Sequence, residues 1–323
     1  MNSDILQVKD LHVHYDTYSG VVKAVGGVDF SVRAGEKLGL VGESGCGKSS
    51  TVLALLRMIK PPGRIVAGQV LLDGVDLLRL SDEEMRLARF AAISLIPQGA
   101  MNSLNPVMRI REQMADTMRA HNGGRPKREL QDRVRELLQW VGLSDWVANM
   151  FPHELSGGMK QRVCIAMAIS LKPKVVIADE PTSALDVVVQ RRVMHTLERV
   201  QQELGASVIL AGHDMGLMAQ FVDRLGVMYA GLLVELGATE GVFEEPLHPY
   251  ARLLIDTLPS LDRKGDFKGI PGVAPSLLSL PPGCAFQPRC PHAFDRCSVD
   301  EPAWQEARPG RWVACHLWTE GRG

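Results

Sequence analysis

The sequence predicts an α/β fold in which a central sheet is covered by helices on both faces. One observation is a strand-like run, Leu38–Val41, that leads into a glycine-rich loop and then into a segment of helical composition, Ser50–Ile59. The others are two near-continuous apolar runs, Val175–Ala178 and Val208–Ala211, which a helix-like stretch separates. Runs that are apolar on both sides are typical of central strands in a covered sheet. Alternating strands and helices therefore indicate an α/β core.

The bulk composition narrows the classes of protein. The chain has 323 residues, which is enough for two domains and a sizeable core. Its 36 Lys and Arg residues balance 37 Asp and Glu residues, so the formal net charge of -1 offers no broad field to attract phosphate backbones or anionic lipid. We therefore expect no nucleic-acid partner.

Neither a secretory signal nor a membrane span is expected. The start, MNSDILQVKD, has no basic flank followed by an apolar core. The longest uncharged apolar stretch, Leu225–Val234, has ten residues, about half of the roughly 20 that a membrane-spanning helix needs. We expect a cytosolic chain whose role at a membrane depends on partner subunits.

The first forty residues alternate short β-like runs with turn signals, which predicts a small antiparallel sheet near the N-terminus. The predicted strands are Leu6–Val8, Leu11–Tyr15, Val28–Val32 and Lys37–Val41. From about Asp82 to Val141 the chain is charged and periodic, as in a mainly helical insertion. Its clearest amphipathic helix is Pro126–Val141, with the proline at the first helical position. A further helix is predicted at about Val188–Leu204.

Beyond residue 240 the chain changes character. Prolines recur, and only one helix is convincing, around Tyr250–Thr257. We expect a small irregular C-terminal module that starts at about residue 260.

The glycine-rich loop fits the pattern G-x-x-x-x-G-K-[ST]. Its residues are Gly42, Glu43, Ser44, Gly45, Cys46, Gly47, Lys48 and Ser49, and Ser50 follows. The glycines let backbone N–H groups face one concavity, and the following helix directs its positive end there. Lys48 would neutralise the β- and γ-phosphates of ATP, Ser49 would ligate Mg²⁺, and Cys46 would contribute its backbone N–H.

A second element is the apolar strand that ends in Asp179 and Glu180. Because alternate side chains of a strand point in different directions, one carboxylate can serve a metal ion and the other an attacking water. Asp179 fits the Mg²⁺ ligand and Glu180 the general base. An acidic strand end is common, so this pattern alone decides little.

The third element is the run Leu155–Arg162, which reads LSGGMKQR. It resembles the signature motif of the ABC ATPases, which other P-loop NTPases lack. Ser156 can cap the helix that begins near Gly158, and Gly157 and Gly158 leave backbone amides uncovered for a phosphate. Met159 stands where the commonest signature has Gln, which removes a polar side chain near the ribose. The phosphate-binding residues are intact, so we expect hydrolysis.

The resemblance to ABC ATPases implies roles for further residues. Gln98 resembles the glutamine that reaches Mg²⁺ and the attacking water. Ser183–Asp186 resembles the D-loop, and Asp186 would face the partner's nucleotide. His213 resembles the switch histidine at the γ-phosphate, and Tyr15 stands where the family has an aromatic residue on adenine. The alternative for Tyr15 is an ordinary core residue.

The resemblance covers about residues 4–258 and narrows to one branch. Asn102–Pro106 and Pro246–Tyr250 resemble the branch that imports oligopeptides, dipeptides, nickel and some oligosaccharides. That branch has a C-terminal extension with a Pro-Arg-Cys-Pro run, which Pro288–Pro291 matches. The implied function is ATP-driven import of peptides, with nickel or an oligosaccharide as the alternative solute.

Four of the six cysteines lie in the last forty residues, with the spacing C-x₅-C-x₆-C-x₁₇-C. They are Cys284, Cys290, Cys297 and Cys315. Branch members with this pattern are similar in carrying a 4Fe-4S cluster at these cysteines. Structural zinc also uses four thiolates, although usually as C-x₂₋₄-C pairs. The cluster is therefore our prediction, zinc is the alternative, and a metal-free module stays open.

The predicted architecture is a P-loop ABC ATPase with a RecA-like sheet core. The nucleotide-binding domain would span residues 1–258, with a helical subdomain at about 99–168, and the cysteine module residues 259–323. The P-loop of one subunit would face the signature of another, so the isolated chain should bind ATP yet hydrolyse it poorly.

By resemblance, the partners are a second ATPase subunit, favoured as a paralogue, two transmembrane permease subunits and an extracytoplasmic solute-binding protein. The chain would sit at the cytoplasmic face of the membrane.

Two other classes of function remain. One is a soluble ABC ATPase of DNA repair, chromosome handling or translation, but the long coiled coils, zinc hairpins or second ATPase domain of such proteins are not visible here. The other is a redox or metal sensor, in which the cysteine module gates transport.

Overall fold

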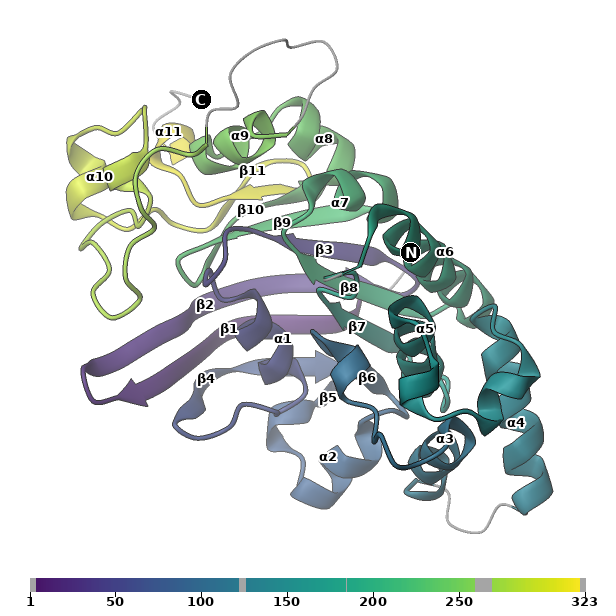
Figure 1. The fold of residues 1–323 in the computed structure, drawn as a ribbon. Coiled ribbons are helices and arrows are strands. Elements are labelled where there is room, and N and C mark those ends of the chain that lie inside the picture. Colours follow the sequence, from purple (N-terminus) through teal and green to yellow (C-terminus); the bar gives the residue numbers. More distant parts are fainter. Residues whose placement is uncertain (1–3, 122–125, 184, 259–268, 320–323) are drawn as a thin grey trace. The chain divides into compact units, whose positions relative to one another are not determined.

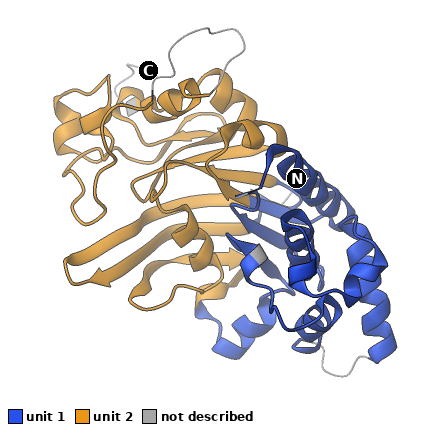
Figure 2. Ribbon diagram, viewed as in Figure 1, with its two compact units in different colours: residues 1–5, 33–36, 79–209 blue, residues 6–32, 37–78, 210–323 orange. Residues whose placement is uncertain are grey.

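The computed structural model describes residues 4–121, 126–183, 185–258 and 269–319. Its chain forms two compact units, which Figure 2 colours separately. The first unit contains residues 1–5, 33–36 and 79–209, and the second contains residues 6–32, 37–78 and 210–323. The predicted domain boundary at 258/259 adjoins residues 259–268, which lie outside the described part of the chain.

An antiparallel sheet near the N-terminus belongs to the second unit. Its strand order is β2-β1-β4-β5. The strands are β1 (Asp4–Thr17), β2 (Gly20–Arg33), β4 (Gly63–Leu72) and β5 (Val75–Asp76). The sequence predicts two strands where the structure has β1 alone. The turn signal at Lys9-Asp10 is a bulge, because the register to β4 shifts between Lys9 and Val13 and Asp10 has a positive φ of 46°.

The second unit also contains the strand order β11-β12-β10-β9-β3. These strands are β3 (Lys37–Val41), β9 (Arg224–Tyr229), β10 (Leu232–Ala238), β11 (Gln305–Arg308) and β12 (Arg311–Val313). β3 runs parallel to β9, and β9, β10, β12 and β11 are joined antiparallel in turn. Because β3 and β9 are almost fully buried, their residues are apolar on both sides, as expected for covered strands.

Short helices accompany these strands (Figure 1). They are α1 (Lys48–Leu55), α7 (Met215–Phe221), α8 (Thr239–Glu244), α9 (Pro249–Asp256), α10 (Asp295–Val299) and α11 (His316–Thr319), with 3-10 turns at Leu77–Arg79 and Gln287–Arg289. The expectation of an irregular C-terminal segment is only partly right, since β11 and β12 form a hairpin on β10. Fully buried Glu235 of β10 receives a bond from the Arg311 guanidinium at 2.6 Å, which ties this hairpin down.

The first unit joins buried strands to a group of helices. β6 (Ile93–Ile96) and β7 (Val175–Asp179) pair in parallel, and β8 (Ser207–Gly212) begins beside β7. The helices are α2 (Asp82–Ala88), α3 (Ile110–Arg119), α4 (Lys127–Trp140), α5 (Gly157–Ala168) and α6 (Val187–Leu204), with 3-10 turns at Ala100–Asn102, Asp145–Asn149 and Pro152–Glu154. Helices α3, α4 and α5 contact one another, as a mainly helical insertion should.

Two predicted helices are refined by the structure. Pro126 is the N-cap of α4 and not its first helical residue. The apolar positions Leu130, Val134, Leu137 and Leu138 are buried, as their spacing predicts. Across the described ranges, every helix is too short or too polar to cross a lipid bilayer.

Candidate ATP site

The predicted P-loop is a strand–loop–helix turn in the second unit. β3 ends at Val41, and α1 begins at Lys48 with Gly47 as its N-cap. Gly47 has a φ of 105°, and a Cβ there would collide with the carbonyl oxygen of Ala24, so only glycine fits. The first turn of α1 contains no acidic residue, which leaves its positive end available to an anion.

Lys48 lies inside this loop with 6% of its surface exposed. Its Nζ donates to the carbonyl oxygens of Gly42 at 2.7 Å and Glu43 at 3.0 Å. The ammonium group is therefore held in the concavity where the glycines turn. Ser49 and Ser50 are half-buried at the start of α1, whereas Ser44 and Gly45 are exposed at the tip of the loop.

Cys46 and Tyr15 flank the same loop. Burial raises the pKa of the Cys46 thiol, so the side chain is an uncharged small group. Its backbone carbonyl accepts from the N–H of Gly231 at 2.9 Å. The Tyr15 hydroxyl lies 3.4 Å from the Ser50 hydroxyl, and the ring is half-buried. The structure thus brings Tyr15 to the first turn of α1.

The acidic strand end lies in the first unit. Asp179 closes β7 with 5% of its surface exposed, and Glu180 follows with a positive φ of 45°. Exposed Gln98, just beyond β6, donates from Nε2 to Oε2 of Glu180 at 3.0 Å. Because β6 and β7 are neighbours, the structure brings together the two residues predicted to handle the attacking water.

The signature run forms the start of α5. Ser156 is the N-cap, and its hydroxyl accepts from the N–H of Met159 at 3.3 Å, as predicted. The helix has no acidic residue in its first turn. Gly157, Gly158 and Met159 are half-buried, and Ser156 is exposed. A second helix start is therefore open to an anion.

The remaining predicted residues are also helix caps or lie beside one. Asp186 caps α6 by accepting from the N–H of Val189 at 3.0 Å. Residue 184 of the predicted D-loop lies outside the described residues. Exposed His213 stands just before Asp214, which caps α7 through the N–H of Leu217.

Sequence reasoning did not assign a role to the side chains that hold Glu43. The Tyr250 hydroxyl accepts from the Glu43 N–H at 2.9 Å, and the Arg289 guanidinium binds the Glu43 carboxylate at 2.7 and 3.0 Å. Arg289 lies 246 positions from Glu43, so no local pattern could pair them.

The four C-terminal cysteines are near one another. The Cys284 N–H donates to the Cys297 carbonyl at 2.8 Å. Burial, with a smaller contribution from charge on the neighbouring cysteines, raises the pKa of Cys284 to about 11 and that of Cys315 to about 12. All four are free thiols, yet no group of three or more described His, Cys, Asp or Glu residues is placed to hold a metal ion.

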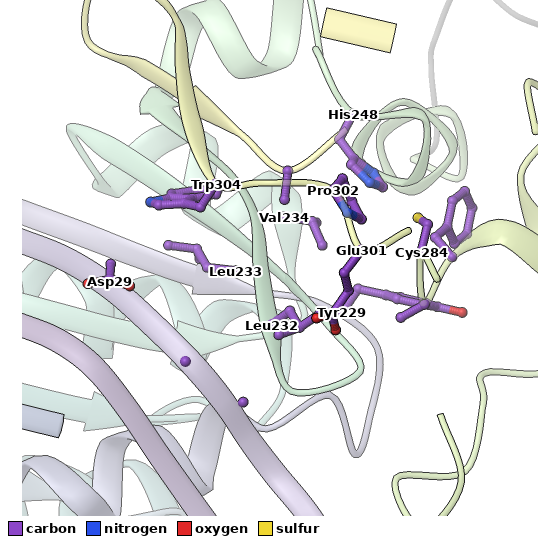
Figure 3. A pocket seen from close by; sticks show the side chains of 15 residues that line it. Asp29, Tyr229, Leu232, Leu233, Val234, His248, Cys284, Glu301, Pro302 and Trp304 are labelled. Carbon is purple, nitrogen blue, oxygen red and sulfur yellow. The ribbon is translucent and has the colours of Figure 1, made fainter. Parts of the chain in front are cut away.

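A cavity of about 180 Å³ lies beside this cysteine segment. Figure 3 shows Cys284 and His248 on one side of the view and Trp304 and Asp29 on the other. Tyr229 also lines it, and its hydroxyl accepts a bond from Arg289. The cavity therefore adjoins the residues that hold the P-loop.

The motifs and the fold of the two units define a class of protein. The chain matches the family described as ABC transporter over residues 25–183, and the oligopeptide/dipeptide transporter C-terminal region over residues 234–297. A dimeric ATP-binding cassette, MJ0796, solved in a post-hydrolysis state with ADP and Pi, is similar with a TM-score of 0.65 and 27% identity over 72% of this chain and 98% of that chain. The protein is a P-loop ATPase of the ABC type.

Curated relatives narrow the class. The dipeptide transport ATP-binding protein DppD of Caldanaerobacter subterraneus subsp. tengcongensis is 41% identical over 99% of both chains. The oligopeptide transport ATP-binding protein OppD of Salmonella typhimurium is 44% identical over 96% of this chain and 93% of its own. The chain belongs to the family of dipeptide and oligopeptide transport ATP-binding proteins.

Proposed function

We propose that this chain binds and hydrolyses ATP to drive the import of dipeptides or oligopeptides through partner membrane subunits. The observation that carries this proposal is the similarity, over nearly the whole chain, to relatives named as dipeptide and oligopeptide transport ATP-binding proteins. The similarity includes the C-terminal region, in which the match is to peptide transporters.

The P-loop would bind the phosphates of ATP. Lys48 already sits in the loop concavity on two carbonyl oxygens, from which its Nζ can turn to the β- and γ-phosphates. The open start of α1 adds its positive end. Tyr15, beside Ser50, is the aromatic surface proposed for adenine.

The predicted Mg²⁺ ligands are the Ser49 hydroxyl, the Asp179 carboxylate and the Gln98 amide oxygen. These are hard oxygen donors, which fit Mg²⁺. In the structure the Gln98 Nε2 is used by Glu180, which leaves its amide oxygen for the ion. A bound Mg²⁺ would neutralise charge on the β- and γ-phosphates.

Glu180 is the proposed general base. It would accept a proton from a water whose oxygen bonds to the γ-phosphorus while the bond to ADP breaks. The Gln98 amide would hold the Glu180 carboxylate in place, and His213 would contact the γ-phosphate.

The signature residues would complete the site of another subunit. Ser156, Gly157, Gly158 and Met159 form the positive start of α5, which has no acidic residue in its first turn, and Asp186 would lie nearby at the start of α6. Each chain would thus provide half of two sites. We therefore propose a second ABC ATPase subunit as partner, with a paralogue favoured, and poor hydrolysis by the isolated chain.

The other proposed partners follow from the relatives' transport function. They are two transmembrane permease subunits and an extracytoplasmic solute-binding protein, with this chain at the cytoplasmic face of the membrane. A peptide-loaded binding protein should stimulate ATP hydrolysis only when the permease subunits are present.

The cysteine segment is proposed to hold a 4Fe-4S cluster. Charge on neighbouring cysteines contributes to the raised pKa of Cys284, Cys290 and Cys315, which supports a shared site for the four sulfurs. The gaps between these cysteines do not match the C-x₂₋₄-C pairs that are usual for structural zinc, which favours iron–sulfur over zinc.

Iron and sulfide analysis of the whole chain purified without oxygen would test the cluster. We expect a brown protein with about four irons and four sulfides per chain. A colourless protein with one zinc would contradict the cluster. Retained ATPase coupling after loss of the metal would contradict a sensor role for this segment.

Transport by the reconstituted complex tests the main proposal. Vesicles containing the permeases and both ATPase subunits should hydrolyse ATP faster when the binding protein carries peptide. Stimulation by nickel or an oligosaccharide alone would identify the alternative solute, and copurification with DNA or ribosomes would place the chain in a non-transport class.

The Glu180→Gln variant tests the proposed general base. It should retain ATP binding and lose ATP turnover, and full turnover by this variant would exclude Glu180 as the base.

A further inference from the structure

Glu43 is an acidic residue inside a loop proposed to bind phosphates. Its backbone is held at both ends, since the N–H donates to Tyr250 and the carbonyl accepts from Lys48. Its carboxylate forms a bidentate ion pair with Arg289, in which the two terminal guanidinium nitrogens lie 2.7 and 3.0 Å from the two carboxylate oxygens. One residue thus connects the loop lysine to the C-terminal segment.

Arg289 is itself firmly placed, with only 4% of its side chain exposed. Its Nε donates to the carbonyl of Pro271 at 2.8 Å, and one terminal nitrogen donates to the Tyr229 hydroxyl at 3.3 Å. A planar guanidinium held on several sides loses little further freedom when it binds a carboxylate.

The ion pair between Arg289 and Glu43 should affect the binding of ATP through its charge. A bare carboxylate in the loop would repel the negatively charged phosphates, and the repulsion is strong where water is scarce. Glu43 keeps 31% of its side chain exposed, while the paired Arg289 is buried. The arginine therefore cancels the charge of Glu43 at the place where phosphates would bind.

We propose that Arg289 is a positioning residue for the nucleotide site, which holds Glu43 and cancels its charge so that ATP affinity depends on the C-terminal segment. This inference rests on the proposed binding of ATP at the P-loop. It assigns to the Pro-Arg-Cys-Pro run a role on the nucleotide, separate from that of its cysteine.

The test measures MgATP binding by the full chain, using a fluorescent ATP analogue and competition with ATP. Arg289→Met keeps an unbranched, flexible side chain and removes the charge. We expect it to raise the Kd for MgATP about tenfold, the loss typical of unmasking one nearby like charge. Arg289→Lys should recover part of the affinity.

The double variant Arg289→Met/Glu43→Gln separates charge from mere support of the fold. Because it has no carboxylate to repel phosphate, its Kd should be within about threefold of the wild-type Kd. In the assembled transporter, Arg289→Met should raise the KM for ATP while kcat at saturating ATP is retained. Arg308→Ala is the matched control, since Arg308 pairs with Glu245 at 2.5 Å in the same C-terminal segment but is 40% exposed.

The outcomes are distinct. Wild-type affinity in Arg289→Met would overturn the inference, and so would a double variant as weak as Arg289→Met, because that result indicates structural support alone. Failure of the unaltered chain to bind MgATP would instead overturn the proposed function.

Discussion

The Gln98 amide and the Glu180 carboxylate are joined by a hydrogen bond of 3.0 Å, although 82 positions separate them in sequence. Each residue follows the end of a strand, and these strands pair in parallel with Ile96 opposite Ala178. Glu180 also has a left-handed backbone, which is costly for a residue with a side chain. The sheet and this unusual turn together direct the carboxylate toward the amide.

Gln98→Ala should therefore slow hydrolysis without preventing ATP binding. Loss of the bond removes one contact that positions the Glu180 carboxylate, and we expect kcat in the assembled complex to fall roughly 10- to 100-fold. Steady-state ATPase assays at saturating ATP would measure it. Gln139→Ala is the control, because Gln139 makes an equally long bond to Asp145 on an exposed surface. Equal kcat values for the two variants would show that the Gln98 contact is unimportant.

Glu235→Ala should strongly destabilise the chain. Glu235 is fully buried and accepts bonds from the Leu247 and His248 N–H groups and from Arg311. Its removal leaves a mostly buried arginine without its carboxylate, which typically costs about 3–5 kcal/mol. Urea unfolding would measure this loss. Glu245→Ala, which breaks an exposed pair with Arg308, should destabilise the chain much less, because solvent screens that pair.

Stability should fall in mild acid because of His248. Burial lowers the pKa of this histidine from 6.5 to about 3, so the folded chain keeps it neutral while the unfolded chain protonates it below 6.5. The contribution of neutral His248 to the free energy of unfolding is therefore fully present above pH 6.5. Below pH 6.5 it is lost at up to about 1.4 kcal/mol per pH unit.

His248→Asn is the variant that tests this. The imidazole Nδ1 accepts the Tyr250 N–H at the start of α9, and Asn can also accept there without titrating. Between pH 7.5 and 5.5 the wild-type free energy of unfolding should decrease by about 1.4 kcal/mol more than that of the variant. Parallel pH dependences would contradict a neutral buried histidine.

Gly158→Ala should strain the start of the signature helix. A Cβ at this position would lie 2.5 Å from a methyl carbon of Val189, so the Val189 side chain or one of the two helices would have to shift. We expect a loss of about 1–3 kcal/mol in the free energy of unfolding, as for other overpacked sites. Val189→Ala in the same chain should relieve most of it. Gly216→Ala is the control, because its Cβ would meet nothing closer than 3.5 Å.

Local patterns predicted most of the core from the sequence. β3, β7 and α6 begin and end within about one or two residues of their predicted bounds, because burial on one or both faces dictates their residue types. Between Val8 and Leu11 the sequence predicts a turn where the structure has a bulge, since a bulge and a turn use the same residue types.

Long-range pairs could not be predicted in this way. The β11–β12 hairpin depends on Arg311 reaching Glu235, 76 positions away. Within the site, the strand–loop–helix order around residues 42–49 and the cap by Ser156 are short-range features, and the structure confirms both predictions. The ion pair between Arg289 and Glu43 could not be predicted from local patterns, because the two residues are far apart in the sequence and only the fold brings them together.

The β11–β12 hairpin also affects how copies of the chain behave in a crowded cell. β12 covers β10, a strand whose Leu233, Val234 and Leu236 are buried. A chain cut before residue 305 would expose the backbone hydrogen-bonding groups of β10 to other copies, which is a known route to aggregation. β11 instead ends the strand order with four residues, QEAR, that include opposite charges and discourage further pairing. Truncated forms should therefore accumulate as insoluble protein even though their nucleotide motifs are intact.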